Sequence, residues 1–226
     1  MVGDTDLAAI GSLLAEPARA KVLLALADGR ALAAGVLASE AGIAPSTASH
    51  HLARLVDAGL LSVSTRGRHR YFALAGPRVA EQLEAVARVA PAQPVTSMRQ
   101  GTRAHAVRLA RRCYDHLAGR LGVAVTGALC ERGVLAGRNG ARFTVTERGT
   151  ATLAELGVRA EAGQIVRACL DWTEQREHIA GPVGKDLLAR LLELGWLVDA
   201  PATRALRITD LGRANLRDRL GVELPA

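Results

Sequence analysis

Residues 45–74 have the sequence PSTASHHLARLVDAGLLSVSTRGRHRYFAL, and this stretch decides the fold. In a helix turning 100° per residue, four of its apolar side chains gather on one side, with the spacing of a core-facing stripe: Ala48, Leu52, Leu55 and Val56. Pro45 suits the first position of such a helix, and Gly59 suits its end. The opposite side carries short hydrogen-bonding groups and one guanidinium, so the pattern predicts an amphipathic helix with a polar outer face.

After Gly59 the pattern changes from helical spacing to alternation. Leu61, Val63 and Thr65 alternate with serines, and the basic segment RGRHR at residues 66–70 follows before a second apolar run. Two short strands around a basic tip that contains glycine predict a β-hairpin. A helix followed by a hairpin with a cationic tip is typical of a winged helix-turn-helix. In that motif the helix enters the major groove of DNA and the wing contacts phosphate or the minor groove.

The residues around this stretch complete the motif. Upstream, the apolar spacing predicts three short helices over 4–14, 18–27 and 32–40, with residues 43–45 as the turn. Downstream, residues 79–89 have the pattern of a further amphipathic helix. The expected order is therefore three helices, a turn, the polar-faced helix, the wing and a last helix.

Composition limits the class of protein. The chain has 226 residues and a net charge of +7, which is nearly all arginine because Lys21 and Lys185 are its two lysines. The guanidinium group of arginine binds phosphate and guanine edges better than the ammonium group of lysine does, although a GC-rich genome would also enrich arginine. The first residues carry acids where a signal peptide needs cations, and no long apolar run follows. We therefore expect a cytoplasmic protein without a membrane partner. Three cysteines do not suit a disulfide framework.

The pattern S-T-x-S-H-H-L-x-x-L-x-x-A-G-L-L, followed by the arginine-rich tip, resembles the DNA-binding core of the ArsR (arsenic-repressor) family of bacterial regulators. The resemblance covers roughly residues 5–90. It implies a homodimer joined through the first and last helices of the domain. It also implies a repressor that leaves its operator when an effector binds.

The resemblance also assigns the contacts to double-stranded DNA. On the polar-faced helix it implies contacts to bases and phosphates from Ser46, Thr47, Ser49, His50 and Arg54. On the wing it implies contacts from Arg66, Arg68 and Arg70. We expect the wing arginines to supply affinity through phosphates and the helix to read an inverted repeat with half-sites ~34 Å apart. His51, at the edge of the apolar stripe, is expected to pack or to contact a phosphate.

The sequence departs from the family where its metal chemistry usually lies. The helix before the turn, residues 32–38, has no cysteine, although the thiolate arsenic site of the namesake members is there. The helix after the wing has no histidine, although zinc sites of other members are there. Neither departure affects DNA binding, which requires no cofactor.

A two-proline segment at 91–97 is the predicted domain boundary, and the rest of the chain contains a repeat. His116-LAGRLG recurs as His178-IAGPVG, and Thr146-ERG as Thr209-DLG. Each copy predicts a helix ending in glycine and then a hairpin, with turns at 138–140 and 200–202. The expected fold is mainly α with short β-hairpins. We expect a winged helix-turn-helix DNA-binding and dimerisation domain at 1–92, followed by two winged-helix-like repeats at 99–158 and 159–226. Neither repeat has a polar recognition face, so we expect them to pack together as one regulatory domain.

The repeats also duplicate a small polar set, which is the candidate effector site: Cys113, Tyr114, Asp115, His116, Cys169, Asp171, Trp172 and His178. Cys113 and His116 are three residues apart, so one helical face could present both. Thiols, imidazoles and carboxylates near a pseudo-twofold axis suit a soft metal ion or an arsenical. They equally suit a pocket for an organic effector, with Tyr114 and Trp172 as walls. A third reading makes the cysteines small buried hydrophobes and the aspartates caps or arginine partners. Cys130 is expected in the core.

The sequence has no nucleotide-binding glycine loop, no H-E-x-x-H and no G-x-S-x-G, so an enzyme is not expected. A cluster of four arginines is expected to be a solvated or acid-paired face rather than a phosphate contact: Arg103, Arg108, Arg111 and Arg112. The predicted function is a DNA-binding transcriptional repressor. The alternatives are a thiol- or metal-responsive sensor that uses the C-terminal repeats, and a sequence-tolerant architectural DNA-binding protein.

Overall fold

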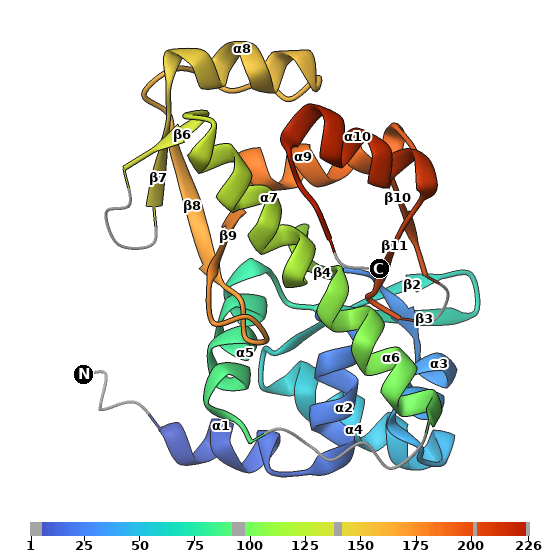
Figure 1. Ribbon diagram of the computed structural model, residues 1–226. Helices are drawn as coiled ribbons and strands as arrows, with labels where there is room; N and C mark the ends of the chain where they lie inside the picture. Colours follow the sequence, from blue (N-terminus) through green and yellow to red (C-terminus); the bar gives the residue numbers. More distant parts are fainter. Residues whose placement is uncertain (1–5, 92–97, 138–141, 201–202, 225–226) are drawn as a thin grey trace. The chain divides into compact units, whose positions relative to one another are not determined.

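Short helices and a small sheet build the first of two units of the chain (Figure 1). The computed structural model describes residues 6–91, 98–137, 142–200 and 203–224 of both units. The units divide between Leu83 and Glu84, inside a helix and before the expected boundary at residue 92. Of the expected linker, only Pro91 is among the described residues. The elements of the first unit, with the helix that leaves it, are α1 (Leu7–Leu14), α2 (Pro17–Ala25), β1 (Leu32–Ala33), α3 (Ala34–Ala41), α4 (Pro45–Asp57), β2 (Leu61–Arg66), β3 (His69–Leu74) and α5 (Pro77–Val89).

Local sequence explains where these helices begin and end. The Asp6 carboxylate accepts a hydrogen bond from the N–H of Ala9 and caps α1. Pro17 and Pro45 occupy the first turns of α2 and α4, where a missing N–H costs nothing. Gly42 ends α3 with a φ of 72°, a left-handed conformation that glycine adopts without strain. The turn between α3 and α4 is therefore set by its own residues.

The wing is a three-stranded sheet in the order β1-β3-β2. The pairing of β2 with β3 runs from Leu61↔Leu74 to Arg66↔His69, which leaves a two-residue turn at Gly67 and Arg68. The tip is thus narrower than expected from sequence, because Arg66 and His69 belong to the strands. The helix expected from residue 32 begins two residues later, because Leu32 and Ala33 pair with the edge of β3.

The second unit repeats one order of elements: hairpin, helix, hairpin, helix. After α6 (Met98–Leu109) the first copy consists of β4 (Arg111–Cys113), β5 (His116–Ala118), α7 (Gly119–Glu131), β6 (Leu135–Ala136), β7 (Arg142–Val145) and α8 (Glu147–Glu155). The second copy consists of β8 (Ile165–Leu170), β9 (Glu177–Ala180), α9 (Gly181–Glu193), β10 (Leu197–Asp199), β11 (Leu206–Ile208) and α10 (Asp210–Leu220). The expected turn at 138–140 and most of the turn at 200–202 lie outside the described residues.

Each copy resembles the first unit from its long helix onward. Gly59, Gly133 and Gly195 follow α4, α7 and α9 with φ values of 70°, 67° and 67°. A hairpin follows each glycine. Before the long helix, however, each copy has a β-hairpin where the first unit has helices. The sequence pattern of a helix, a glycine and a wing therefore identifies only the later part of each repeat.

Strands of the two copies pair with each other. The wing strand β7 of the first copy pairs with β8 of the second, with Phe143↔Val166 in register, in the four-stranded sheet β6-β7-β8-β9. Reciprocally, a bridge between Arg111 and Ala205 joins the first residue of β4 to the segment that leads into β11. Helix α7 packs on β9 and α9 packs on β5. The copies are therefore interlocked around a pseudo-twofold axis.

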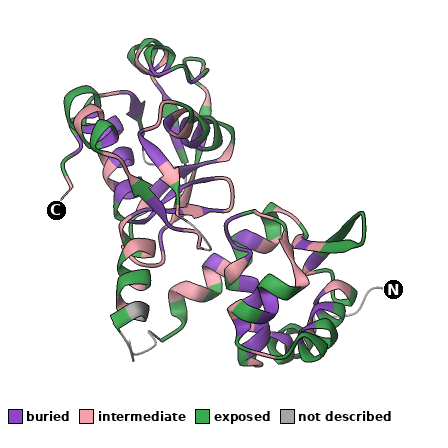
Figure 2. Ribbon diagram, turned by 90° about the vertical axis from the view of Figure 1, so that its right-hand side faces the viewer, coloured by how far each residue is buried: buried purple, intermediate pink, exposed green. Residues whose placement is uncertain are grey.

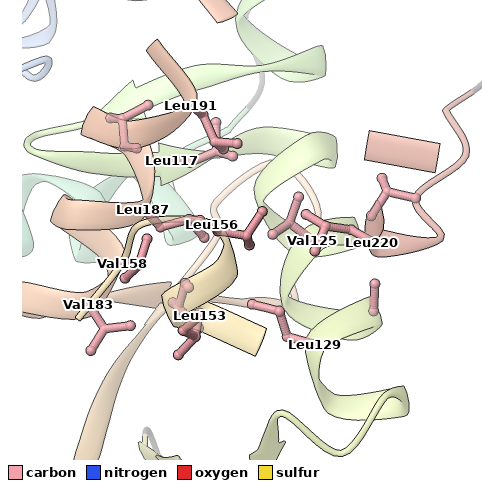
Figure 3. Packing of buried hydrophobic residues seen from close by; sticks show 14 of the residues in the cluster. Leu117, Val125, Leu129, Leu153, Leu156, Val158, Val183, Leu187, Leu191 and Leu220 are labelled. Carbon is pink, nitrogen blue, oxygen red and sulfur yellow. The ribbon is translucent and has the colours of Figure 1, made fainter. Parts of the chain in front are cut away.

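Side chains of both copies fill one core in the second unit (Figure 3). Leu117, Val125 and Leu129 of the first copy lie in the same cluster as Leu187 and Leu191 of the second. All five are at most 3% exposed. The expectation that the helices of the repeats pack together is in line with this shared core.

Candidate nucleic-acid interface and Cys–His cluster

Helix α4 has one buried and one exposed face. Ala48, Leu52 and Leu55 are at most 1% exposed, as the apolar stripe predicts. The residues expected to contact DNA on this helix are all exposed: Ser46, Thr47, Ser49, His50 and Arg54. The hydroxyl of Ser49 donates to the carbonyl of Pro45 at 2.9 Å, and its oxygen can still accept a hydrogen bond. The helix thus presents donors and acceptors to solvent while its apolar face stays packed.

Most of the ribbon of the wing is coloured as exposed (Figure 2). Arg66, Arg68 and Arg70 are exposed, as is nearly all of β2. The guanidinium of Arg66 lies 5.7 Å from the ring centre of Tyr71, and that of Arg70 lies 5.3 Å from the ring centre of Phe72. Such cation–π contacts orient the two guanidinium groups along the ribbon. Arg68 occupies the turn itself, at the tip of the wing.

His51 belongs to the packing of the first unit. Its Nδ1 lies 3.4 Å from the guanidinium of Arg19, a side chain that is 5% exposed. Arg19 in turn donates to the carbonyl oxygens of Leu13 and Ser12, both at 2.8 Å. Of the two roles expected for His51, packing is the one with contacts in the structure.

Two cysteines and two histidines of the second unit come together, and we call them the Cys–His cluster: Cys113, His116, Cys169 and His178. One potential ligand atom from each residue lies within 4.8 Å of all the others. The Sγ atoms of the two cysteines are 4.0 Å apart, and the centres of the two imidazole rings are 5.1 Å apart. Cys113, His116 and His178 are buried, and Cys169 is half-buried.

The cluster is built by strands, and the helical spacing expected for Cys113 and His116 is wrong. These two residues face each other as a cross-strand pair of β4 and β5. Cys169 and His178 form the equivalent pair of β8 and β9. The tight β4–β5 turn, in which Tyr114 has a φ of 59°, reverses the chain between residues that a helix would have placed one turn apart. Each repeat therefore contributes one Cys–His pair.

Two helix glycines let the pairs approach each other. A Cβ atom on Gly122 would lie 2.6 Å from the carbonyl oxygen of Leu117 and 3.5 Å from the Cβ of His178. A Cβ atom on Gly184 would lie 2.7 Å from the carbonyl oxygen of Ile179 and 3.4 Å from the Cβ of His116. The glycine of each repeat thus lies against the histidine of the other, which explains why the HxAGxxG sequence is repeated.

Each histidine of the cluster has a carboxylate beside Nδ1. Asp115 Oδ1 lies 3.2 Å from Nδ1 of His116, and Asp171 Oδ2 lies 3.4 Å from Nδ1 of His178. The second contact is an ion-pair distance without the alignment of a hydrogen bond. Nε2 of both histidines is buried and has no hydrogen-bond partner among the described residues. Buried polar atoms are nearly always paired, so these two nitrogen atoms are candidate ligand atoms.

The cluster continues into a buried ionic network. Asp171 Oδ2 accepts from Nη2 of Arg111 at 3.0 Å and from the N–H of Gly119 at 2.7 Å, and both charged side chains are 0% exposed. Nη2 of Arg111 also lies 3.9 Å from Oε2 of Glu84, whose other oxygen accepts from Arg204 at 2.9 Å. Glu84 belongs to α5, so a chain of charges leads from His178 to the helix that continues the first unit.

Hydrogen bonds and charges shift several pKa values in the cluster. The hydrogen bond with Cys113, together with the two neighbouring histidines, lowers the pKa of Cys169 to about 2, against the opposing effect of burial. The same bond to Cys169, with burial, raises the pKa of Cys113 well above its ordinary value. Burial lowers the basicity of His116, but Asp115 and Cys169 outweigh it and raise its pKa. One thiol of the pair is therefore a much stronger acid than the other.

The other expected effector residues have different surroundings. Trp172 lies beside two guanidinium groups, those of Arg111 and Arg204, at 5.2 and 5.9 Å from its ring centre. Tyr114 lies in the β4–β5 turn. A groove of about 530 Å³ is lined by other residues of the second unit, including Val123, Thr126, Cys130, Phe143 and Arg176. The organic-effector pocket walled by Tyr114 and Trp172 stays a prediction.

Sequence reasoning misses Glu84 and the inward position of Arg111. The sequence groups Arg111 with the solvated or acid-paired arginines, and it is acid-paired but fully buried. Arg112 fits that expectation at the surface, with two bonds of 2.8 and 2.9 Å to Asp199. Cys130 packs against the core as expected. No local pattern marks Glu84, because its partners lie more than 20 residues away in the sequence.

A helix-turn-helix whose second helix keeps a polar face exposed beside a basic wing defines a class of DNA-binding proteins. Residues 14–64 match a family model described as a helix-turn-helix domain. Over 224 residues the chain is 42% identical to the HTH-type transcriptional regulator YdfF of Bacillus subtilis (strain 168). The aligned region covers 97% of this chain and 99% of YdfF. The chain therefore belongs to the family of HTH-type transcriptional regulators, with an ArsR-like winged helix-turn-helix in its first unit. Relatives of this kind are regulators and not enzymes.

Further similarities cover part of the chain. The HTH-type transcriptional regulator CmtR of Mycobacterium tuberculosis is 38% identical over 80 residues, which are 35% of this chain and 67% of that protein. The solved structure of CmtR, described as a cadmium metal-sensor, is 35% identical and covers 41% of this chain and 100% of its own, with a TM-score of 0.32. The homodimeric winged helix-turn-helix domain Mb0332 of Mycobacterium bovis is 31% identical and covers 38% of this chain and 86% of its own, with a TM-score of 0.33. In the described part of the chain, no helix combines the length and apolar character needed to cross a membrane.

Proposed function

We propose that this transcriptional regulator is a homodimeric repressor that leaves its operator when an effector binds in the second unit. The observation that carries the proposal is the exposed polar face of α4 beside an arginine-bearing wing. A regulator of this kind acts where the DNA is, in the cytoplasm.

Different residues serve affinity and sequence choice. Ser49, His50 and Arg54 offer hydroxyl, imidazole and guanidinium groups of the kinds that recognise base edges in the major groove. Ser46 and Thr47 lie in the first turn of α4, where their hydroxyl groups can donate to phosphate oxygens. A helix N-terminus itself also binds phosphate. Arg66, Arg68 and Arg70 supply phosphate contacts from the wing.

Exposed apolar residues on the first and last helices support the dimer. Helix α1 has the sequence LAAIGSLL, yet Leu13 is its only buried residue. Leu7 and Val89, on α1 and α5, are 76% and 85% exposed. An apolar helix left uncovered in a single chain suits an interface with a second copy. Two copies related by a twofold axis would read an inverted repeat with half-sites ~34 Å apart.

A selection from random duplexes tests the proposal with the full-length protein. We expect enrichment of an inverted repeat, followed by a footprint on it with two protected half-sites. Sedimentation of the protein with that duplex should give two chains per operator. A footprint without sequence preference would instead support the architectural alternative and refute the proposal.

A further inference from the structure

We propose that the Cys–His cluster binds one thiophilic metal ion, Zn²⁺ or the softer Cd²⁺, through two sulfur and two imidazole nitrogen atoms. The claim that this ion is the effector rests on the proposed function, whereas the claim that it binds does not. No residue of the first unit takes part, so the site differs in place from those implied by the family resemblance.

The distance between the sulfur atoms fits a metal ion. With zinc–sulfur bonds of ~2.3 Å, two ligands of a tetrahedral ion lie ~3.8 Å apart. The Sγ atoms of Cys113 and Cys169 are 4.0 Å apart. A disulfide would need them at ~2.05 Å. The cysteines are therefore placed to share an ion rather than a covalent bond.

The histidines have the surroundings of metal ligands. A ligating imidazole usually keeps a carboxylate or carbonyl at its other nitrogen, which fixes its orientation and tautomer. Asp115 and Asp171 occupy that position beside Nδ1 of His116 and His178. Nε2 of each ring is left buried without a partner among the described residues, and one ion between the rings would engage both atoms.

The donor set selects the class of ion. Sulfur and imidazole donors in a tetrahedral S₂N₂ set suit zinc and softer ions, whereas Mg²⁺ and Ca²⁺ require oxygen ligands. Two thiolates would balance the charge of a divalent ion in this largely buried place. Four protein ligands leave no open position, which is typical of a structural or regulatory site and not of a catalytic one.

The ion would also cross-link the two repeats. One Cys–His pair comes from β4 and β5 and the other from β8 and β9. Binding would fix His178 against Asp171, and through it Arg111 and Glu84 on α5. Since α5 continues from the first unit, this network gives the ion a physical route to the DNA-binding elements.

Metal titration of the reduced, chelator-treated full-length protein tests the site directly. We expect one Cd²⁺ or Zn²⁺ per chain, with a thiolate-to-cadmium absorption band in the ultraviolet. Cys113→Ser and Cys169→Ser should each lower the affinity more than 100-fold, because the loss of a ligand exceeds the 10–100-fold effect of an outer-shell partner. Cys130→Ser is the matched control and should bind as the wild type does. Asp115→Asn, at a half-exposed side chain, should weaken binding about 10–100-fold.

The outcomes separate the two claims. Metal affinity that is equal in the wild type and the Cys113→Ser and Asp115→Asn variants would overturn the site, as would a Cys113–Cys169 disulfide that forms in place of metal uptake. Operator affinity is then measured with and without Cd²⁺. An ion that binds at the cluster and leaves operator affinity unchanged would overturn its role as effector. Absence of any operator binding, with the metal still bound, would refute the proposed function and leave the site standing.

Discussion

Asp171 holds together the centre of the second unit, and its replacement by asparagine should have a large effect on stability. The carboxylate accepts from five donors: Nη2 of Arg111 at 3.0 Å, the N–H of Gly119 at 2.7 Å, the N–H and hydroxyl of Thr173 at 2.9 and 2.6 Å, and the N–H of Glu174 at 3.2 Å. An asparagine offers one acceptor oxygen and points an NH₂ group at donors. It would also leave the guanidinium of Arg111 buried without its nearest counter-charge.

Removing one partner of a buried ion pair costs about 3–5 kcal/mol. Glu84 remains 3.9 Å from Arg111, so we expect the lower end of that range for Asp171→Asn. For a chain of this size, 1 kcal/mol corresponds to about 2–4 °C, so the melting temperature of the second unit should fall by about 6–12 °C. Both tryptophans, Trp172 and Trp196, lie in this unit, so tryptophan fluorescence during urea unfolding reports its stability.

A surface ion pair provides the control. Asp199 makes two bonds to Arg112, but its side chain is 54% exposed, so Asp199→Asn should cost less than about 1 kcal/mol. If Asp171→Asn were no more destabilising than Asp199→Asn, the reasoning about the buried network would be refuted.

The same contacts predict a pH dependence in chelator-treated protein. Burial opposes ionisation of Asp171, but the Arg111 guanidinium, with Thr173 and Gly119, holds its pKa below its ordinary value. A lowered folded-state pKa stabilises the protein fully above the unfolded pKa of about 3.9, and this contribution declines as the pH falls toward the folded value. The difference in unfolding free energy between the wild type and Asp171→Asn should therefore be constant near neutrality and shrink below about pH 4.

Four further changes test the two sites. Arg68→Ala should weaken binding to all duplexes and reduce the slope of log affinity against log salt by about 0.9 for each phosphate that the wing no longer neutralises. An unchanged slope would show that the wing tip does not touch phosphate. His50→Ala should instead relax the choice of DNA sequence. Gly184→Ala would place a Cβ 2.7 Å from the carbonyl oxygen of Ile179, so we expect lower stability in urea and weaker cadmium binding. The control is Gly127→Ala on α7, where the added Cβ would meet no atom within 4 Å. Glu84→Gln should leave cadmium affinity within a few-fold of wild type but reduce its effect on operator binding, and an undiminished effect in titrations against labelled duplex would exclude the α5 route.

The sequence predicts some parts of this molecule better than others because the underlying interactions differ in range. Helix α4 and the wing follow from local spacing, since Ala48, Leu52 and Leu55 recur with helical period and Gly67 allows the turn. The members of the Cys–His cluster stand out because the repeat duplicates them. Their geometry does not follow from spacing, because two strands and a tight turn can span the same three residues as one helical turn. Arg111 and Asp171 meet across 60 positions of the sequence, and no short pattern encodes such a contact.

The pairing between the two repeats has a consequence for the origin of the second unit. The repeats share a sheet through the pairing of β7 with β8, and a bridge joins Arg111 of β4 to the segment before β11. A tandem gene duplication explains such a chain most simply: a half-length ancestor would have associated as a symmetric pair, with its thiol and imidazole on the symmetry axis. Such a fusion would let the halves diverge, in keeping with the present asymmetry, in which Asp171 carries the buried charge network and Asp115 stays near the surface.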